Sequence, residues 1–335
     1  MTRKHRGSAG RLAAPTMADL AQLAGVSTIT VSRALADSPL VNARTRERIQ
    51  ALAREHGYAV NLSARNLRLR RSMTVAVVVE MAPNADRVMS GPYPLDLLGG
   101  ISQVLTPAGY GILLTSLQAG RPPAIGDVDG VILLGQGPEE RSMRMVQEWG
   151  RPLVVWGAVS RDANQVVVGS DNIRGGRQAA ERFLALGRNK PVFLGDPIHG
   201  EFAERQQGFQ AALGSHRIKP LAISVPSLTV AAGNQAVQQL LDQQPSVDAL
   251  FAVSDLLAIG AIRALLESGR RVPEDVSVIG FDGTPLGASY VPPLTSVHQD
   301  FIEAGTLLAR KILALIAGEA TGSETLPTRL VVRAT

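Results

Sequence analysis

Cysteine is absent from the 335 residues of the chain, and histidine is rare. Without cysteine the chain forms no disulfide and offers no thiolate to a metal or a substrate. The five histidines are scattered and lack the spacing of a metal-ligand set; they are His5, His56, His199, His216 and His298. We therefore expect neither a metal site nor a cofactor.

Long apolar runs are missing as well. No segment approaches the roughly 18 consecutive apolar residues that a membrane-spanning helix needs. The charged N-terminus is not followed by the apolar stretch of a secretion signal. We expect no membrane association and a location in the cytoplasm.

Signals of catalysis are also scarce. The segment Gly135–Gly137 follows an apolar run but lacks the rest of the dinucleotide-binding glycine pattern. No serine, cysteine or histidine constellation suited to nucleophilic catalysis is present. We expect a protein that is not an enzyme.

Charge is distributed unevenly along the chain. Residues 1–72 carry thirteen basic and four acidic residues, a net charge of +9, which leaves −4 for the remainder of a chain whose total is +5. A basic head on a mildly acidic body is typical of a polyanion-binding module joined to a part that does not bind polyanions. Residues 1–15 alone are expected to form a disordered basic tail.

Three short helices are expected in residues 16–58. Each begins at a residue whose side chain can cap the first turn, and the first and third end at a glycine. A tight turn at 24–26 separates the first two helices, which is the helix-turn-helix arrangement. The caps are Thr16, Ser27 and Asn42, and the glycines are Gly25 and Gly57.

From Met73 onward, short apolar runs alternate with amphipathic segments. Such runs are typical of parallel strands covered on both faces by helices. The body is therefore α/β and doubly wound, and it is too long for one sheet, which favours two lobes with a ligand at the carboxyl ends of the strands. The expected strands are 75–79, 111–115, 130–134, 153–156, 165–168, 191–194, 221–224, 249–253 and 276–281.

The expected organisation is a tail, a head, a linker and a body. The helix-turn-helix head spans 16–58 and an arginine-rich linker spans 59–72. The body spans 73–335. Its first lobe is expected at about 73–164 and 297–320, and its second lobe at about 165–296 and 321–335.

Several segments resemble the lactose/galactose-repressor (LacI/GalR) family of bacterial regulators. The stretch 17–35, MADLAQLAGVSTITVSRAL, matches the opening signature of that family nearly position for position. The segments 41–49 (VNARTRERI), 61–67 (NLSARNL), 278–282 (VIGFD) and 292–300 (PPLTSVHQD) are similar to its later motifs. The resemblance implies an all-α head that binds DNA and a two-lobed, periplasmic-binding-protein-like, doubly wound body that binds a small effector.

The resemblance implies base contacts from Thr28, Ile29 and Arg33 on the second helix. The Arg33 guanidinium can donate two hydrogen bonds to guanine in the major groove, although a phosphate contact is the alternative. Thr28 and Ile29 suit thymine methyls. Contacts to the DNA backbone are expected from short or amphipathic donors, namely Ser27, Thr30, Ser32, Asn42, Thr45, Tyr58 and Asn61.

The segment 61–69 is too short to be a stable helix alone. In the family this hinge folds when two copies meet over the operator, and a leucine matching Leu67 wedges into the minor groove beside the residue matching Ala64. The alternative is that Leu67 is an ordinary linker residue.

Effector contacts are expected from Arg205 and Asp282, a donor fork and an acceptor suited to vicinal hydroxyls or a ring amide. The alternative is that these two residues are structural partners. Gln299, Tyr93 and Ser254 match further family positions. Trp156 offers a stacking face, or is a core residue. Gly157 stands where the family often has an aspartate.

The expected function is a sequence-specific transcriptional regulator, a repressor that binds a pseudo-palindromic operator as a homodimer, associated with the nucleoid. A sugar or sugar derivative is the expected effector, with a nucleobase or a partner protein as alternatives. A DNA-bending regulator without an effector is a further alternative. A transported-solute-binding protein would share the body but would need a secretion signal and no head.

Overall fold

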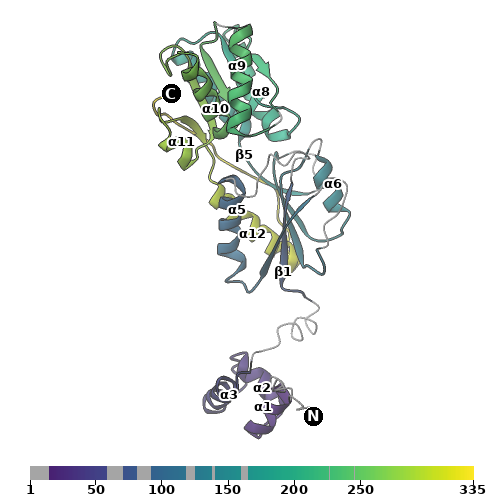
Figure 1. Cartoon of the computed structure of the whole chain (residues 1–335). Helices are drawn as coiled ribbons and strands as arrows, with labels where there is room; N and C mark the ends of the chain where they lie inside the picture. The colour runs from purple at the N-terminus through teal and green to yellow at the C-terminus, as the bar shows by residue number, and fades with distance from the viewer. Residues whose placement is uncertain are drawn as a thin grey trace, which may run out of the picture. The chain divides into compact units, whose positions relative to one another are not determined.

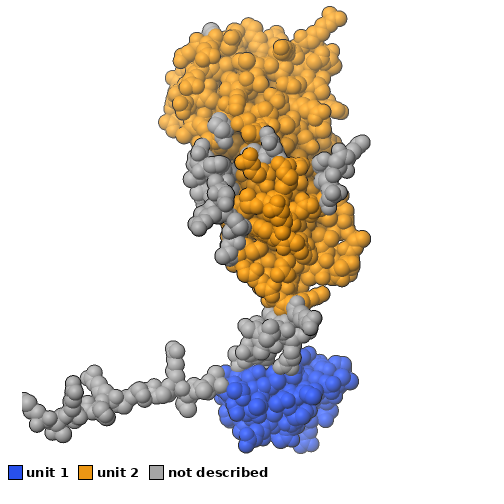
Figure 2. Space-filling model, turned by 90° about the vertical axis from the view of Figure 1, so that its right-hand side faces the viewer, with its two compact units in different colours: residues 1–70 blue, residues 71–335 orange. Residues whose placement is uncertain are grey.

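The computed structural model describes residues 15–58, 71–80, 92–117, 125–137, 140–159, 165–225, 227–244 and 246–335. The chain divides into two compact units, residues 1–70 and residues 71–335, which Figure 2 colours blue and orange. The predicted hinge, with Asn61, Ala64 and Leu67, lies outside the described residues, as does nearly all of the predicted tail.

Three helices form the head, with the caps that the sequence predicts. The side chains of Thr16, Ser27 and Asn42 each accept a hydrogen bond from a backbone N–H in the first turn of the helix that follows. Gly25 ends the first helix with a positive φ of 63°, a conformation that glycine adopts without strain. The helices are α1 (Met17–Ala24), α2 (Thr28–Leu35) and α3 (Ala43–Glu55).

A small core and the long side chain of Arg48 hold the head together. Leu20, Val31 and Ile49, one from each helix, are fully buried. Arg48 of α3 donates to the carbonyl oxygen of Ala24 at 2.6 Å, which satisfies a free carbonyl at the end of α1. The turn between α1 and α2 is thus fixed by a side chain of α3 as well as by its own backbone.

The first lobe of the body contains a parallel sheet of six strands. Valines of β1 alternate between two cores: Val75 and Val77 pack beneath α5 and α12, and Val78 packs on the opposite face beneath α6 (Figure 1). The strand order is β11-β5-β4-β3-β1-β2. The elements are β1 (Thr74–Glu80), α5 (Pro92–Leu105), β2 (Gly111–Leu117), β3 (Gly130–Leu134), α6 (Arg141–Gln147), β4 (Leu153–Trp156), β5 (Val166–Ser170), α12 (Phe301–Ala317) and β11 (Glu324–Leu326).

The second lobe repeats this plan with the order β12-β10-β9-β8-β6-β7, in which only the β10–β12 pairing is antiparallel. Its core is built around Phe193, Phe209 and Phe251. The elements are α7 (Asn172–Ala185), β6 (Pro191–Leu194), α8 (Gly200–Gly214), β7 (Leu221–Ile223), α9 (Val230–Gln243), β8 (Ala249–Ala252), α10 (Asp255–Glu267), β9 (Ser277–Asp282), α11 (Pro285–Ser289), β10 (Thr295–His298) and β12 (Arg329–Val331).

The chain passes between the lobes three times: between β5 and α7, between β10 and α12, and between β11 and β12. Two crossings are tied together, because Asp171 donates its N–H to the carbonyl oxygen of Leu326 and accepts from the hydroxyl of Thr328. The predicted lobe limits are wrong at two places. Strands β5 and β11, which the sequence analysis assigns to the second lobe, extend the first sheet. Apolar strands carry no mark of which sheet they join.

Asp255 is a buried carboxylate that ties three elements of the second lobe. It is fully buried and accepts hydrogen bonds from the N–H and hydroxyl of Thr284 and from the hydroxyl of Ser296. Burial raises the pKa of Asp255, and these hydrogen bonds oppose the rise. The carboxylate thus joins the start of α10 to the loop after β9 and to β10.

Asp255→Ala should therefore destabilise the body markedly. The substitution leaves the Thr284 and Ser296 donors buried without this acceptor, and each such loss costs about 1–3 kcal/mol. We expect a loss of several kcal/mol in the free energy of unfolding measured with urea. Asp127→Ala is the control, since Asp127 makes only an exposed ion pair with Arg151. Equal stability of the two variants would contradict the structural role of Asp255.

Candidate ligand cavity and nucleic-acid interface

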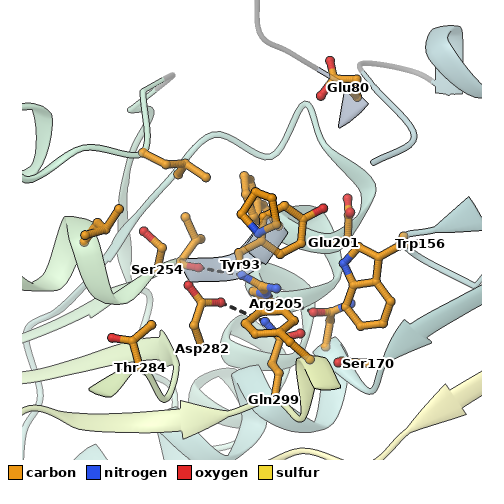
Figure 3. Close-up of a pocket in the computed structure, with 18 of the residues that line it drawn as sticks. Glu80, Tyr93, Trp156, Ser170, Glu201, Arg205, Ser254, Asp282, Thr284 and Gln299 are labelled. Carbon is orange, nitrogen blue, oxygen red and sulfur yellow. Dashed lines mark hydrogen bonds between the residues drawn. The ribbon is translucent and has the colours of Figure 1, made fainter. Parts of the chain in front are cut away.

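A cavity of about 230 Å³ lies between the two lobes, where carboxyl ends of strands from both sheets line it. The first lobe contributes aromatic side chains, and the second lobe contributes most of the charged ones. All six residues that the sequence analysis proposes as effector contacts line it: Tyr93, Trp156, Arg205, Ser254, Asp282 and Gln299. Figure 3 shows Arg205 among the labelled residues, with Asp282 and Gln299 beside it.

Arg205 is held in place by α7 and by the end of β8. Its Nε donates to Asn172 Oδ1 at 2.9 Å, and its Nη1 donates to the carbonyl oxygen of Val253 at 2.5 Å. The guanidinium carbon lies 3.7 Å from the centroid of the Phe281 ring, a cation–π contact. Close helix packing sets this position: a Cβ on Gly176 of α7 would lie 2.0 Å from the Arg205 carbonyl oxygen.

Asp282 ends β9 and faces the cavity in an unusual backbone conformation. Its φ is 113°, a region that residues other than glycine rarely adopt. Its Oδ1 accepts from Gln299 Nε2 at 2.8 Å. Burial raises the pKa of Asp282 to about 7; the Arg205 charge opposes this rise and the Asp255 charge adds to it. Asp282 therefore changes charge near neutral pH. Backbone strain at such a position is common in functional sites.

Two of the crossings contribute residues to the cavity wall. Ser170 and Asn172 flank the first crossing, and Gln299 lies in the second. Asn172 also donates to Glu204 Oε2 at 3.0 Å, so one amide links Arg205 to a carboxylate. The cavity wall therefore includes two of the segments that join the lobes.

An aromatic wall covers the first-lobe side. Phe301, at the start of α12, lies edge-to-face with Tyr93 and with Trp156, at centroid distances of 5.4 and 6.1 Å. Trp156 is buried in the core of the first lobe and also lines the cavity. Trp156 is therefore a core residue at the edge of the cavity, and its role as a stacking face for a ligand stays a prediction.

Two other expectations are refined by the structure. The Ser254 hydroxyl caps α10 by accepting from Leu257 N–H, so its side chain has a structural role beside its place in the wall. Next to Gly157, the Gln136 side chain bonds the backbone of Ala158 in both directions at 2.9 Å. A Cβ on Gly157 would lie 2.5 Å from Gln136, which explains why no aspartate fits there without a shift of that side chain.

Asn172, Glu201 and Phe301 are cavity residues that the sequence analysis missed. Asn172 comes directly after the crossing from β5, and its polar character at the end of an apolar strand was the available signal. Glu201 lies four residues before Arg205 on α8, hence on the same face. Phe301 gave no signal, because its packing depends on a contact with Trp156, far away in the sequence.

The second helix of the head presents an exposed face opposite its buried one. Val31 and Ala34 are fully buried, whereas Ser27, Thr28 and Arg33 are exposed and Ile29 is 62% exposed. At 3.6 residues per turn, Thr28, Ile29 and Arg33 share this open side. Of the other proposed contacts, Asn42 is exposed and Thr30, Ser32, Thr45 and Tyr58 are half-buried. Ser27 and Asn42 use their side chains as helix caps.

The head and the two-lobed body define a class of protein: a DNA-binding regulator with a ligand-binding body. The model of the bacterial regulatory proteins of the lacI family matches residues 16–61, and that of the periplasmic binding protein-like domain matches residues 180–335. Among the described residues, none of the helices combines the length and apolar character needed to cross a bilayer.

Relatives of known class match over nearly the whole chain. The HTH-type transcriptional regulator CelR of Thermobifida fusca is 35% identical over 332 residues, covering 95% of both chains. GntR of Pseudomonas aeruginosa is 32% identical over 317 residues, covering 91% of this chain and 90% of its own. The chain therefore belongs to the LacI family of bacterial transcriptional regulators, which are DNA-binding proteins and not enzymes.

Solved structures agree with this assignment. The lac repressor dimer bound to operator and the anti-inducer ONPF superposes with a TM-score of 0.84 at 26% identity, covering 96% of this chain and 98% of that chain. The CelR–cellobiose complex has a TM-score of 0.72 at 34% identity, covering 96% and 99%. The helix-turn-helix head and the two-lobed fold predicted from the sequence are thus confirmed.

The raised pKa of Asp282 predicts a pH-dependent stability of the unliganded body. Folding binds a proton that the unfolded carboxylate releases near pH 4, so this contribution is fully present below pH 4 and is lost as the pH rises through 7. We expect the free energy of unfolding to fall by up to about 1.4 kcal/mol per pH unit from this group. Arg205 on α8, Asp255 on α10 and Gln299 face Asp282 and set the size of the effect.

Urea unfolding of the wild type and of Asp282→Asn between pH 4.5 and 8 measures this slope. The asparagine does not titrate, so the difference in unfolding free energy between the two proteins should change with pH below 7 and level off above it. Glu319→Gln, at an exposed site beyond α12, is the control. Parallel pH profiles of the wild type and Asp282→Asn would contradict the raised pKa.

Proposed function

We propose that the protein is a repressor that binds a pseudo-palindromic operator as a homodimer and responds to a sugar bound between the lobes. One observation carries this proposal: a single chain holds a helix-turn-helix head and an interlobe cavity with a buried arginine and carboxylate, at segments where the lobes are joined. We place its action in the cytoplasm, on the nucleoid.

A sugar suits the chemistry of the cavity. Sugar hydroxyls pair well with a guanidinium and a carboxylate, and the C–H face of a sugar ring packs well on aromatic side chains. Arg205, Asp282 and Gln299 offer the polar groups, and Tyr93, Trp156 and Phe301 offer the aromatic ones. A relative in this family, CelR, has been solved with cellobiose, which makes that disaccharide the first probe.

The head reads DNA through α2 in this proposal. Arg33 donates to guanine, and Thr28 and Ile29 contact thymine methyls or small apolar steps. Phosphate contacts come from hydroxyls, amides and Tyr58 around the helix starts. Asn61, Ala64 and Leu67 of the hinge, outside the described residues, contact the backbone and the minor groove of a bent operator. Two heads read the two half-sites, because one head alone specifies too few base pairs.

The coupling between sugar binding and operator binding follows from the position of the ligand between the lobes. A sugar that contacts both lobes favours one angle between them, and that angle determines whether two hinge segments meet on the operator. The ligand shifts this equilibrium only as far as its affinities for the two arrangements differ. The residues at the crossings, Asn172 and Gln299, are the ones that would sense the change.

Selection of duplexes from a randomised DNA pool tests the proposed function directly. The full-length protein is used at near-physiological salt, where binding through phosphates alone is weakened. We expect recovery of a pseudo-palindrome with a flexible pyrimidine–purine step at its centre. Recovery of no motif, with and without cellobiose and other sugars, would contradict a sequence-specific regulator.

Arg33→Ala should cost about 1–3 kcal/mol of operator affinity and relax the preference for one base pair in each half-site. The change removes a base contact and one positive charge. Arg54→Ala, an exposed arginine near the end of α3, removes the same charge without a proposed base contact. Fluorescence anisotropy measures the affinity of both protein variants for operators that carry single-base changes. Uniform weakening across all sequences by Arg33→Ala would show that Arg33 contacts phosphate.

Arg205→Lys should weaken sugar binding at least about tenfold, or 1.4 kcal/mol, while operator affinity without sugar is retained. Lysine keeps the charge but lacks the planar fork that reaches Asn172 and Val253 together. Calorimetry measures sugar binding, and thermal unfolding checks the fold. Arg263→Lys on α10, whose side chain is exposed, is the control. An unchanged sugar response in Arg205→Lys would mean that the ligand binds elsewhere.

A further inference from the structure

The cavity holds one cation and at least two carboxylates near it. Among the described residues that line it, Arg205 is the only basic one, whereas Glu201 and Asp282 line the same cavity. Glu204, one turn from Glu201 on α8, is half-buried beside them and accepts from Asn172. Glu80 lines the cavity as well, apart from this cluster in Figure 3.

The charge of Arg205 is already engaged inside the protein. Its Nε and Nη1 donate to Asn172 and Val253, and one face of the guanidinium lies on the Phe281 ring. Burial lowers the pKa of Arg205, and the negative charges of Asp282, Glu201 and Glu204 oppose that change. These carboxylates balance the guanidinium before any ligand enters. A ligand anion would be attracted by one cation, whose hydrogen bonds and charge are already partly satisfied, and would be repelled by several carboxylates.

We propose that the cavity selects its effector by charge: it takes an uncharged sugar and excludes the acidic sugar of the same shape, with Glu201 as the residue that enforces the exclusion. This inference rests on the proposed function, because it concerns the effector of that same site. Interactions between charges are strong where water is excluded. Repulsion between one carboxylate of the protein and the carboxylate of an acidic sugar therefore suffices to favour the neutral sugar.

Glu201 is suited to this role by its position. It lies in the first turn of α8, four residues before Arg205 on the same face of the helix, and its side chain lines the cavity. Glu204, by contrast, accepts a hydrogen bond from Asn172, and burial raises the pKa of Glu204 and of Asp282. A ligand carboxylate bound beside the Arg205 guanidinium would therefore lie close to Glu201.

Matched pairs of sugars, which differ only in a hydroxymethyl carbon oxidised to a carboxylate, provide the test. The pairs are cellobiose with cellobiuronate, its C6 uronate, glucose with glucuronate, and galactose with galacturonate. Calorimetry on the full-length protein at pH 8, where Asp282 is mostly ionised, gives the affinity ratio within each pair. We expect the neutral member to bind at least about thirtyfold more tightly in the pair that binds best. An acid that binds as tightly as its neutral partner would overturn the inference.

Glu201→Gln supplies the second arm. It keeps the size and polarity of the side chain and removes the charge. The ratio of the affinities for the neutral and the acidic member should therefore fall about tenfold. Glu319→Gln removes one charge just past the end of α12, about 24 Å along that helix from Phe301, and should leave the ratio unchanged. Equal ratios in Glu201→Gln and the wild type would overturn the role of Glu201.

Operator binding, measured by anisotropy with the same sugars, separates this inference from the proposed function. An acidic sugar that changes operator affinity more than its neutral partner would overturn charge selection and leave the sugar-responsive regulator intact. Failure of every sugar to bind or to change operator affinity would overturn the sugar effector and, with it, the inference.

Discussion

A guanidinium buried between two lobes is the constraint around which the body is organised. Burying a charge is costly unless it is paired and hydrogen-bonded, and the partners of Arg205 come from three different segments: Asn172 at a crossing, Val253 at the end of β8, and Phe281 in β9. The close packing of α7 on α8 at Gly176 sets the position of the arginine. The polar half of the cavity therefore depends on the packing of the second lobe.

The three crossings explain how such a cavity serves regulation. They join the sheets next to the residues that line the cavity, and Asp171, Leu326 and Thr328 tie two of them together. A ligand that bridges the aromatic wall and the arginine site contacts both lobes at once. In the proposed regulation, the binding energy of that ligand acts on the angle between the lobes.

The local parts of this structure were predictable from the sequence, and the long-range parts were not. The caps Thr16, Ser27 and Asn42 and the apolar strands are set by neighbours in the chain, so the predicted helices of the head and strands of the body are confirmed. The assignment of β5 and β11 to a lobe was wrong, since only tertiary pairing decides it. Arg205 and Asp282 came from the family resemblance. The spacing of Glu201 from Arg205 was a signal that could have been used, whereas Phe301 required the folded cavity.

The most direct test of the central claim is the affinity for sugar of the free protein and of the protein bound to its operator. Thermodynamic reciprocity requires that the factor by which the sugar changes operator affinity equals the factor by which the operator changes sugar affinity. Calorimetry with cellobiose, or with the sugar that binds best, measures the sugar affinity of the free protein and of the operator-bound protein. The account predicts two affinities that differ by that same factor. Equal affinities in the two forms would contradict a regulator whose DNA binding depends on the ligand between its lobes.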